Sequence, residues 1–162
     1  MSAPRKRAPS PLLLDPAYWR ARLEQLQRVP PCQALFPRPD LSSPGIEVVE
    51  WRLKAHDGVR LWGLRARSNF HPEPKGARIR EVCAAELPQI DVEVVSAGKV
   101  EYVLQVPAGR RLEDRVLDLV RVYQCALAAG APPPEIRVAH CNDESCPDEV
   151  LIAASLLESG IC

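Results

Sequence analysis

Apolar and polar side chains alternate between residues 47 and 67, and the dipeptide Asp57-Gly58 interrupts the alternation. A period of two is typical of a half-buried strand, and Asp-Gly favours the two-residue turn of a β-hairpin. A two-residue loop here pairs apolar with apolar side chains, which fixes the register of the two strands. We therefore expect a hairpin with Trp51 and Trp62 buried on the same face of the sheet.

A second stretch of alternating side chains runs from residue 90 to residue 106. A three-residue loop at 97–99 aligns its apolar positions and predicts a second antiparallel hairpin. Residues 77–86, between the two hairpins, alternate only weakly, so an additional strand and a short helix both stay open there.

The first helix is predicted to begin at Pro16. Asp15 precedes it and can accept hydrogen bonds from the first free N–H groups, while proline at the first helical position loses no hydrogen bond. Apolar residues recur from Trp19 to Leu26 at helical spacing, and prolines 30 and 31 follow. This pattern predicts a short helix with one buried stripe.

A longer helix is predicted over residues 112–127, where a broad apolar stripe repeats at helical spacing. Gly130 is the expected stop. Asp114, Asp118 and Arg121 occupy the opposite side, which we expect to face water.

A short strand over residues 136–140 and a last helix opening at Pro147 complete the predicted elements. The sequence therefore predicts antiparallel hairpins followed by a β-α-β-α unit. This order predicts an α+β fold with helices packed on the sheet. We expect residues 1–14 to form a flexible, basic, proline-rich tail and residues 15–162 to form a single domain.

The balance of acidic and basic residues excludes one class of function for this chain. The 162 residues carry 21 basic and 21 acidic side chains, which excludes a dedicated nucleic-acid binder with a basic surface. No apolar run approaches the length needed to cross a bilayer, so we expect no membrane span. The six cysteines come without a secretory signal, so we expect a cytoplasmic protein with free thiols.

Two loops are the best candidates for a site, because each follows a predicted strand and enters a helix. They are residues 107–111 and residues 140–146. Arg110 and Arg111 lie near a helix N-terminus, where an anion can bind between them and the backbone amides. The alternative is that these arginines pair with the acidic residues of the second loop.

The second loop also offers metal ligands. His140, Cys141 and Cys146 carry the imidazole and thiolate groups that suit zinc. Cys146 could instead be a catalytic thiol activated by a helix N-terminus, or a half-buried cysteine in a capped loop. The other two histidines, His56 and His71, are expected to be exposed and without a role.

Residues 48–64 read Val-Val-Glu-Trp-Arg-Leu-Lys-Ala-His-Asp-Gly-Val-Arg-Leu-Trp-Gly-Leu. This segment resembles the first β-hairpin of α/β-hydrolase esterases of the acetyl-xylan-esterase type. The resemblance implies a serine esterase with a Ser/Asp/His triad. None of those three residues can be carried over, because the sequence contains no G-x-S-x-G motif. The resemblance therefore implies a degenerate, truncated relative.

No other catalytic motif occurs in the sequence, so we expect no catalytic activity. The leading hypothesis is a small cytoplasmic binding or assembly module, whose partner is another protein or a second copy bound through an exposed strand. Two alternatives stay open. One is a small metal- or thiol-dependent enzyme that uses loops 107–111 and 140–146, and the other is the degenerate α/β-hydrolase relative.

Overall fold

The fold is built from one sheet and three helices in a computed structural model, which describes residues 15–82, 87–132 and 134–138. The strands are β1 (Ala34–Pro37), β2 (Ile46–Lys54), β3 (Arg60–Ser68), β4 (Gly76–Val82), β5 (Lys99–Gln105) and β6 (Pro134–Val138). The helices are α1 (Pro16–Arg28), α2 (Val92–Ser96) and α3 (Leu112–Ala128). The predicted tail over residues 1–14 and the helix predicted at Pro147 lie outside the described residues.

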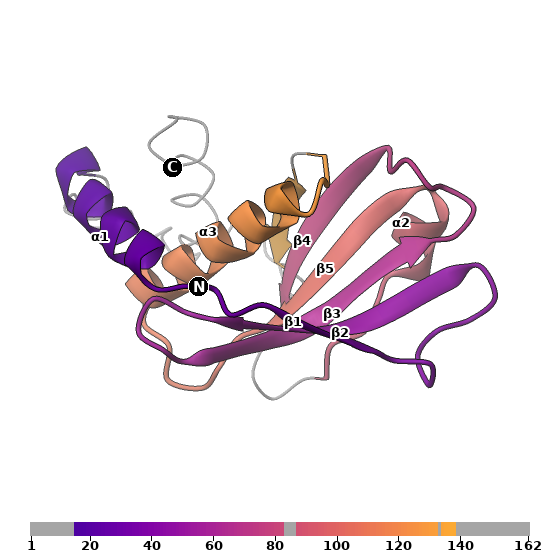
Figure 1. Cartoon of the computed structure of the whole chain (residues 1–162), viewed down its shortest axis with the longest axis horizontal. Coiled ribbons are helices and arrows are strands. Elements are labelled where there is room, and N and C mark those ends of the chain that lie inside the picture. Colours follow the sequence, from indigo (N-terminus) through magenta and orange to yellow (C-terminus); the bar gives the residue numbers. More distant parts are fainter. Residues whose placement is uncertain (1–14, 83–86, 133, 139–162) are drawn as a thin grey trace, which may run out of the picture.

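The strands form a mixed sheet in the order β1-β2-β3-β5-β4-β6 (Figure 1). The pairs β1–β2, β2–β3 and β3–β5 are antiparallel, whereas β4 pairs in parallel with both β5 and β6. The α+β class is thus confirmed. Because β5 and β6 both run parallel to β4, their carboxyl ends lie at the same edge of the sheet.

The helices cover both faces of the sheet. Trp51 of β2 packs in one core cluster with α1 and α3, whereas Val48 of the same strand packs in a second cluster with Val95 of α2. Residues an odd number of positions apart on a strand point to opposite faces. Helices α1 and α3 therefore lie on one face and α2 lies on the other (Figure 1).

The first hairpin is confirmed, but its predicted register is wrong by one residue. Leu53 pairs with Leu61, because the loop contains three residues rather than two: the Ala55 N–H donates to the Val59 carbonyl at 2.8 Å, and Gly58 adopts a φ of 81°. A one-residue shift moves a side chain to the other face. Trp62 consequently lies on the face opposite to Trp51, so the prediction that both share one face is wrong.

The second predicted hairpin is absent. Residues 92–96 form α2 instead, and β5 pairs with β4 in parallel. The Asp91 carboxylate caps this helix by accepting from the Glu93 N–H at 3.1 Å and the Val94 N–H at 3.4 Å. The cap stabilises a helical turn, and Val95 then packs onto the sheet. The open choice over residues 77–86 is settled for 76–82, which form β4.

Helix α1 begins, and helix α3 ends, as their sequence signals predict. The Asp15 carboxylate accepts from the Ala17 N–H at 3.0 Å at the start of α1. Helix α3 ends in a left-handed Gly130 with a φ of 86°. There the Gly130 N–H bonds the Leu127 carbonyl and the Ala131 N–H bonds the Ala126 carbonyl, each at 3.0 Å. This pair of bonds is a Schellman motif.

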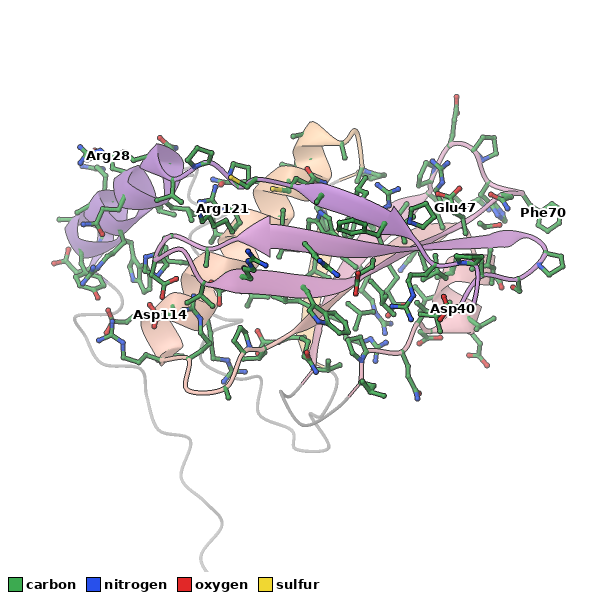
Figure 2. The ribbon with its side chains drawn as sticks, turned by 60° about the horizontal axis from the view of Figure 1, so that its bottom comes forward. Arg28, Asp40, Glu47, Phe70, Asp114 and Arg121 are labelled. Atoms are coloured by element: carbon green, nitrogen blue, oxygen red, sulfur yellow. The ribbon has the colours of Figure 1, made fainter. Side chains whose placement is uncertain are left out.

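The polar side of α3 does not face water. Asp114, Asp118 and Arg121 are all buried, which corrects the expectation of an exposed stripe. Arg121 donates to the Leu26 carbonyl at 2.9 Å and to the Val29 carbonyl at 2.7 Å. It thereby fixes the end of α1 against α3 by satisfying carbonyls at a helix C-terminus; Figure 2 shows Arg121 between the two helices.

Strand β1 was not predicted, because prolines dominate its segment. It forms one edge of the described sheet, so both strands of the first hairpin lie in the interior of the sheet. The edge available to a partner strand on this side is therefore β1, and partner binding stays a prediction.

Cys32 and Cys125 are free thiols. Among the described helices, none has the length and apolarity needed to cross a membrane.

Gly63 provides a test of the contact between β3 and β5. A Cβ at this position would lie 1.9 Å from the Val103 carbonyl oxygen, whereas a Cβ at Gly76 would come no closer than 3.7 Å to the Lys99 side chain. We expect Gly63→Ala to lower the free energy of unfolding by about 3–5 kcal/mol. The control Gly76→Ala should change it by less than about 1 kcal/mol. Urea unfolding of both variants measures this, and equal effects would contradict the pairing of β3 with β5.

Candidate functional site

A polar cluster lies where the first hairpin turn meets the start of α3. The β5–α3 loop leaves the carboxyl end of β5, and the turn before β3 lies at the same edge because β3 is antiparallel to β5. The cluster consists of His56 and Asp57 from the turn, Arg110 and Arg111 from the loop, and Asp114 and Asp118 from the first turns of α3. Residues far apart in sequence thus meet at the edge where the parallel strands end.

Arg110 is the centre of this cluster. Its Nε donates to Oδ2 of Asp118 at 3.0 Å and its Nη2 donates to Oδ1 of the same residue at 2.7 Å. Its Nη1 donates to Oδ2 of Asp57 at 2.6 Å. The Arg110 side chain is only 5% exposed. One buried guanidinium therefore links α3 to the hairpin turn through two carboxylates, in the two-pronged geometry that arginine favours.

A second pair lies beside it. Nε2 of His56 lies 2.9 Å from Oδ1 of Asp114, and both side chains are mostly buried. Arg111 contacts the other oxygen of Asp114 at 3.4 Å, but its own side chain is 71% exposed. The expectation that His56 is an exposed bystander is wrong, because Asp114 holds it against α3.

Burial and pairing shift the three carboxyl groups in different directions. Burial raises the pKa of Asp118 to about 6, against the opposing effect of its hydrogen bonds from Arg110. Burial also raises the pKa of Asp57, but the hydrogen bond and charge of Arg110 outweigh it and lower the pKa. For Asp114 the hydrogen bond from His56 and the nearby arginine charges likewise outweigh burial, so its pKa is lowered.

The cluster has three groups that a metal ion could use. Ligand atoms of His56, Asp57 and Asp114 all lie within 4.8 Å of one another, and imidazole with carboxylate suits several divalent metals. Both carboxylates already accept hydrogen bonds from arginines. A cation would have to displace these bonds and approach the buried charge of Arg110. The contacts therefore favour an ion-pair network that fixes the hairpin to α3 over a metal centre.

The residues predicted from sequence are only partly placed. Arg110 and Arg111 are neighbours in the chain, but Arg110 is buried and paired twice, while Arg111 lies at the surface. Anion binding by this pair stays a prediction, and an anion would compete with two carboxylates for Arg110. The zinc ligands predicted in the second loop, His140, Cys141 and Cys146, lie outside the described residues, so zinc binding also stays a prediction.

Two features of the cluster could have been found from sequence and one could not. Asp114 and Asp118 are four residues apart, which places them on the same side of a helix, and Arg110 precedes them closely. The partner of Asp114, however, is 58 residues away. No local pattern predicts that a histidine in a hairpin turn lies beside that particular carboxylate.

The fold is similar to that of two solved esterase structures. An acetyl xylan esterase from Paenibacillus sp. R4 aligns over 76% of this chain with a TM-score of 0.59 and 11% identity. Acetyl xylan esterase 1 from Thermoanaerobacterium sp. JW/SL YS485 aligns over 90% of this chain with a TM-score of 0.69 and 12% identity. At these identities the likeness concerns the fold, and it agrees with the resemblance of residues 48–64 to the α/β-hydrolase hairpin.

The aligned region is about half of each esterase, 50% of the first and 55% of the second. No protein-family model matches the sequence. The comparison with curated proteins finds no match either. The shape of the chain is therefore similar to that of proteins from which its sequence differs widely.

The contribution of Arg110 to stability can be measured by substitution. We expect Arg110→Met to lower the free energy of unfolding by about 3–5 kcal/mol, because it leaves the buried Asp118 carboxylate without its partner. Arg111→Met is the matched control and should cost less than about 1 kcal/mol, since that ion pair is exposed. Chemical unfolding of the two variants tests this, and equal losses would show that Arg110 is not the centre of the network.

The lowered pKa of Asp114 predicts a loss of stability in acid. Because the folded chain holds its proton less tightly than the usual value of 3.8, this carboxylate stabilises the fold above that pH, and the contribution is lost as pH falls through the folded pKa. Asp114→Asn should therefore flatten the acid side of the curve of unfolding free energy against pH. An unchanged acid side in this variant would contradict the ion pair with His56.

Asp118 should act with the opposite sign. Its pKa is raised to about 6, so its contribution is fully present below its unfolded value and is lost as pH rises through the folded pKa. Between pH 3.8 and about 6 the unfolding free energy should decline as Asp118 loses its proton, and Asp118→Asn should remove this decline. Measured in the same titration, this variant is the contrast to Asp114→Asn.

Proposed function

We propose that this chain is a degenerate α/β-hydrolase-type domain that binds a ligand or partner and does not cleave esters through a serine of its own. The proposal rests on the fold and the missing serine motif taken together. The fold aligns with an acetyl xylan esterase over 90% of the chain, yet the sequence contains no G-x-S-x-G motif.

The missing motif matters because of what it does in a serine hydrolase. There the nucleophilic serine lies in a sharp turn between a strand and a helix, and the flanking glycines allow that turn. In this sequence the residues after β6 read Ala-His-Cys-Asn-Asp-Glu-Ser-Cys, with no glycine among them. This sequence is unsuited to a strained turn of that kind, which supports a binding role.

The polar cluster at the same edge supports the same conclusion. A general base needs a side chain that is free to accept a proton from a substrate. Asp57 and Asp118 are held by Arg110, and the contact of His56 with Asp114 uses its Nε2 atom. These contacts stabilise the junction of the hairpin with α3, and they leave the cluster suited to holding the fold together.

A small metal- or thiol-dependent enzyme is the second candidate. It is favoured by one observation, namely that β5 and β6 both run parallel to β4, so that the segments following them start from one edge of the sheet. In this candidate His140, Cys141 and Cys146 bind zinc, or Cys146 is the reactive thiol. Stoichiometric zinc in the purified protein that is lost in Cys146→Ser would favour it over the binding role.

Esterase chemistry is tested directly with a fluorophosphonate probe, which labels activated serines, and with p-nitrophenyl acetate. We expect no labelling of the purified full chain and no hydrolysis above that of the heat-unfolded protein, because no serine lies in an elbow sequence. A known acetyl esterase run in parallel shows that the assay works. Stoichiometric labelling of one serine, together with hydrolysis abolished by replacing it with alanine, would overturn the proposal.

A further inference from the structure

A cavity of about 310 Å³ opens at the edge of the sheet opposite to Arg110. It lies between the carboxyl end of β3, the amino end of β5 and the carboxyl end of α3. Figure 2 shows Glu47, which contacts two of its arginines, at the far end of the sheet from Asp114. A cavity of this size can hold a small organic molecule.

Tyr102 contributes a phenol group to the wall of the cavity. Its ring packs on Trp51 with 5.1 Å between the ring centroids, and the residue is only 3% exposed. Within the described part of the chain, nothing forms a hydrogen bond with its hydroxyl. Because Tyr102 lines the cavity, its hydroxyl can donate a hydrogen bond to a ligand atom there.

Arg65 is the cross-strand partner of Tyr102, so the two side chains lie on the same face of the sheet, and both line the cavity. Its guanidinium is 18% exposed, and the nearest carboxylate is that of Glu47 at 4.0 Å. Glu47 also pairs with Arg67 at 3.4 Å. One carboxylate thus serves two guanidinium groups, which leaves a net positive charge at the cavity.

The end of α3 does not oppose an anion strongly. Helix C-termini carry negative partial charge on their free carbonyls. Here the N–H groups of Ala129, Gly130 and Ala131 bond carbonyls of the last turn at 3.0 Å. The remaining wall combines apolar side chains, Val100 and two prolines, with the polar side chains of Ser68, Asn69 and His71.

We propose that this cavity binds a small carboxylate anion, with its planar head on Arg65 and the Tyr102 hydroxyl. A guanidinium matches a carboxylate with two parallel hydrogen bonds, and the phenol supplies a third donor. The excess of one positive charge suits a monoanion, and Val100 with the two prolines can contact a short hydrocarbon or ring behind the carboxylate. This site is separate from the polar cluster, so its existence does not depend on the absence of esterase activity.

Benzoate and its neutral analogue benzamide are the probes, titrated into the full chain and followed by NMR of backbone and arginine side-chain N–H groups. We expect saturable shifts around Arg65 and Tyr102 with benzoate at millimolar concentrations and none with benzamide. Arg65→Gln should weaken binding by about tenfold or more, as expected for loss of a charge-assisted pair. Tyr102→Phe keeps the ring on Trp51 and should weaken binding by a smaller factor.

Arg52→Gln is the matched control, because Arg52 lies on the opposite face of the sheet, where it pairs with Glu50. It should leave benzoate binding unchanged. Tyr102→Phe removes a single oxygen, so it remains informative if Arg65→Gln fails to fold. Absence of saturable shifts, equal binding of benzamide, stronger binding of inorganic phosphate at the same residues, or equal losses in the variants and the control would each overturn the proposal.

Discussion

The bond between one buried arginine and two carboxylates determines how the parts of this structure meet. Arg110 connects Asp118 in α3 with Asp57 in the turn of the β2–β3 hairpin. Removing such a charge from water is expensive unless it is fully paired. The pairing therefore joins the loop after β5 both to α3 and to the hairpin turn. The second pair, between His56 and Asp114, strengthens the same junction.

The start or end of an element is predictable from the sequence where the structural signal is local. The cap at Asp15 and the left-handed Gly130 define the start of α1 and the end of α3 through contacts within a few residues. The sequence-based prediction is wrong where two local conformations compete. Asp57-Gly58 fits a two-residue loop and also a three-residue loop with glycine in the last position; the chain adopts the second, and this alone moves Trp62 to the other face. Residues 92–96 alternate like a strand, yet the Asp91 cap and the packing of Val95 favour a helix.

The residues of the candidate sites also differ in whether the sequence predicts them. Arg110 was identified from its position before a helix, but its partners were not, because Asp57 lies 53 residues away. Arg65 and Tyr102 gave no sequence signal, since their meeting depends on the pairing of β3 with β5. The fold itself is similar to that of two acetyl xylan esterases at 11% and 12% identity. Chains that share few identical side chains can therefore adopt a similar backbone arrangement.

The most direct test of the central interaction is a double-mutant cycle between Asp57 and Arg110, measured by urea unfolding of wild type, Asp57→Ala, Arg110→Ala and the double variant. Contacting charged residues in one network typically show coupling energies of about 0.5–3 kcal/mol. A buried guanidinium at 2.6 Å from its carboxylate predicts a value in the upper half of that range. A coupling energy near zero would show that the hairpin turn and α3 are held together by other contacts, and would contradict this account.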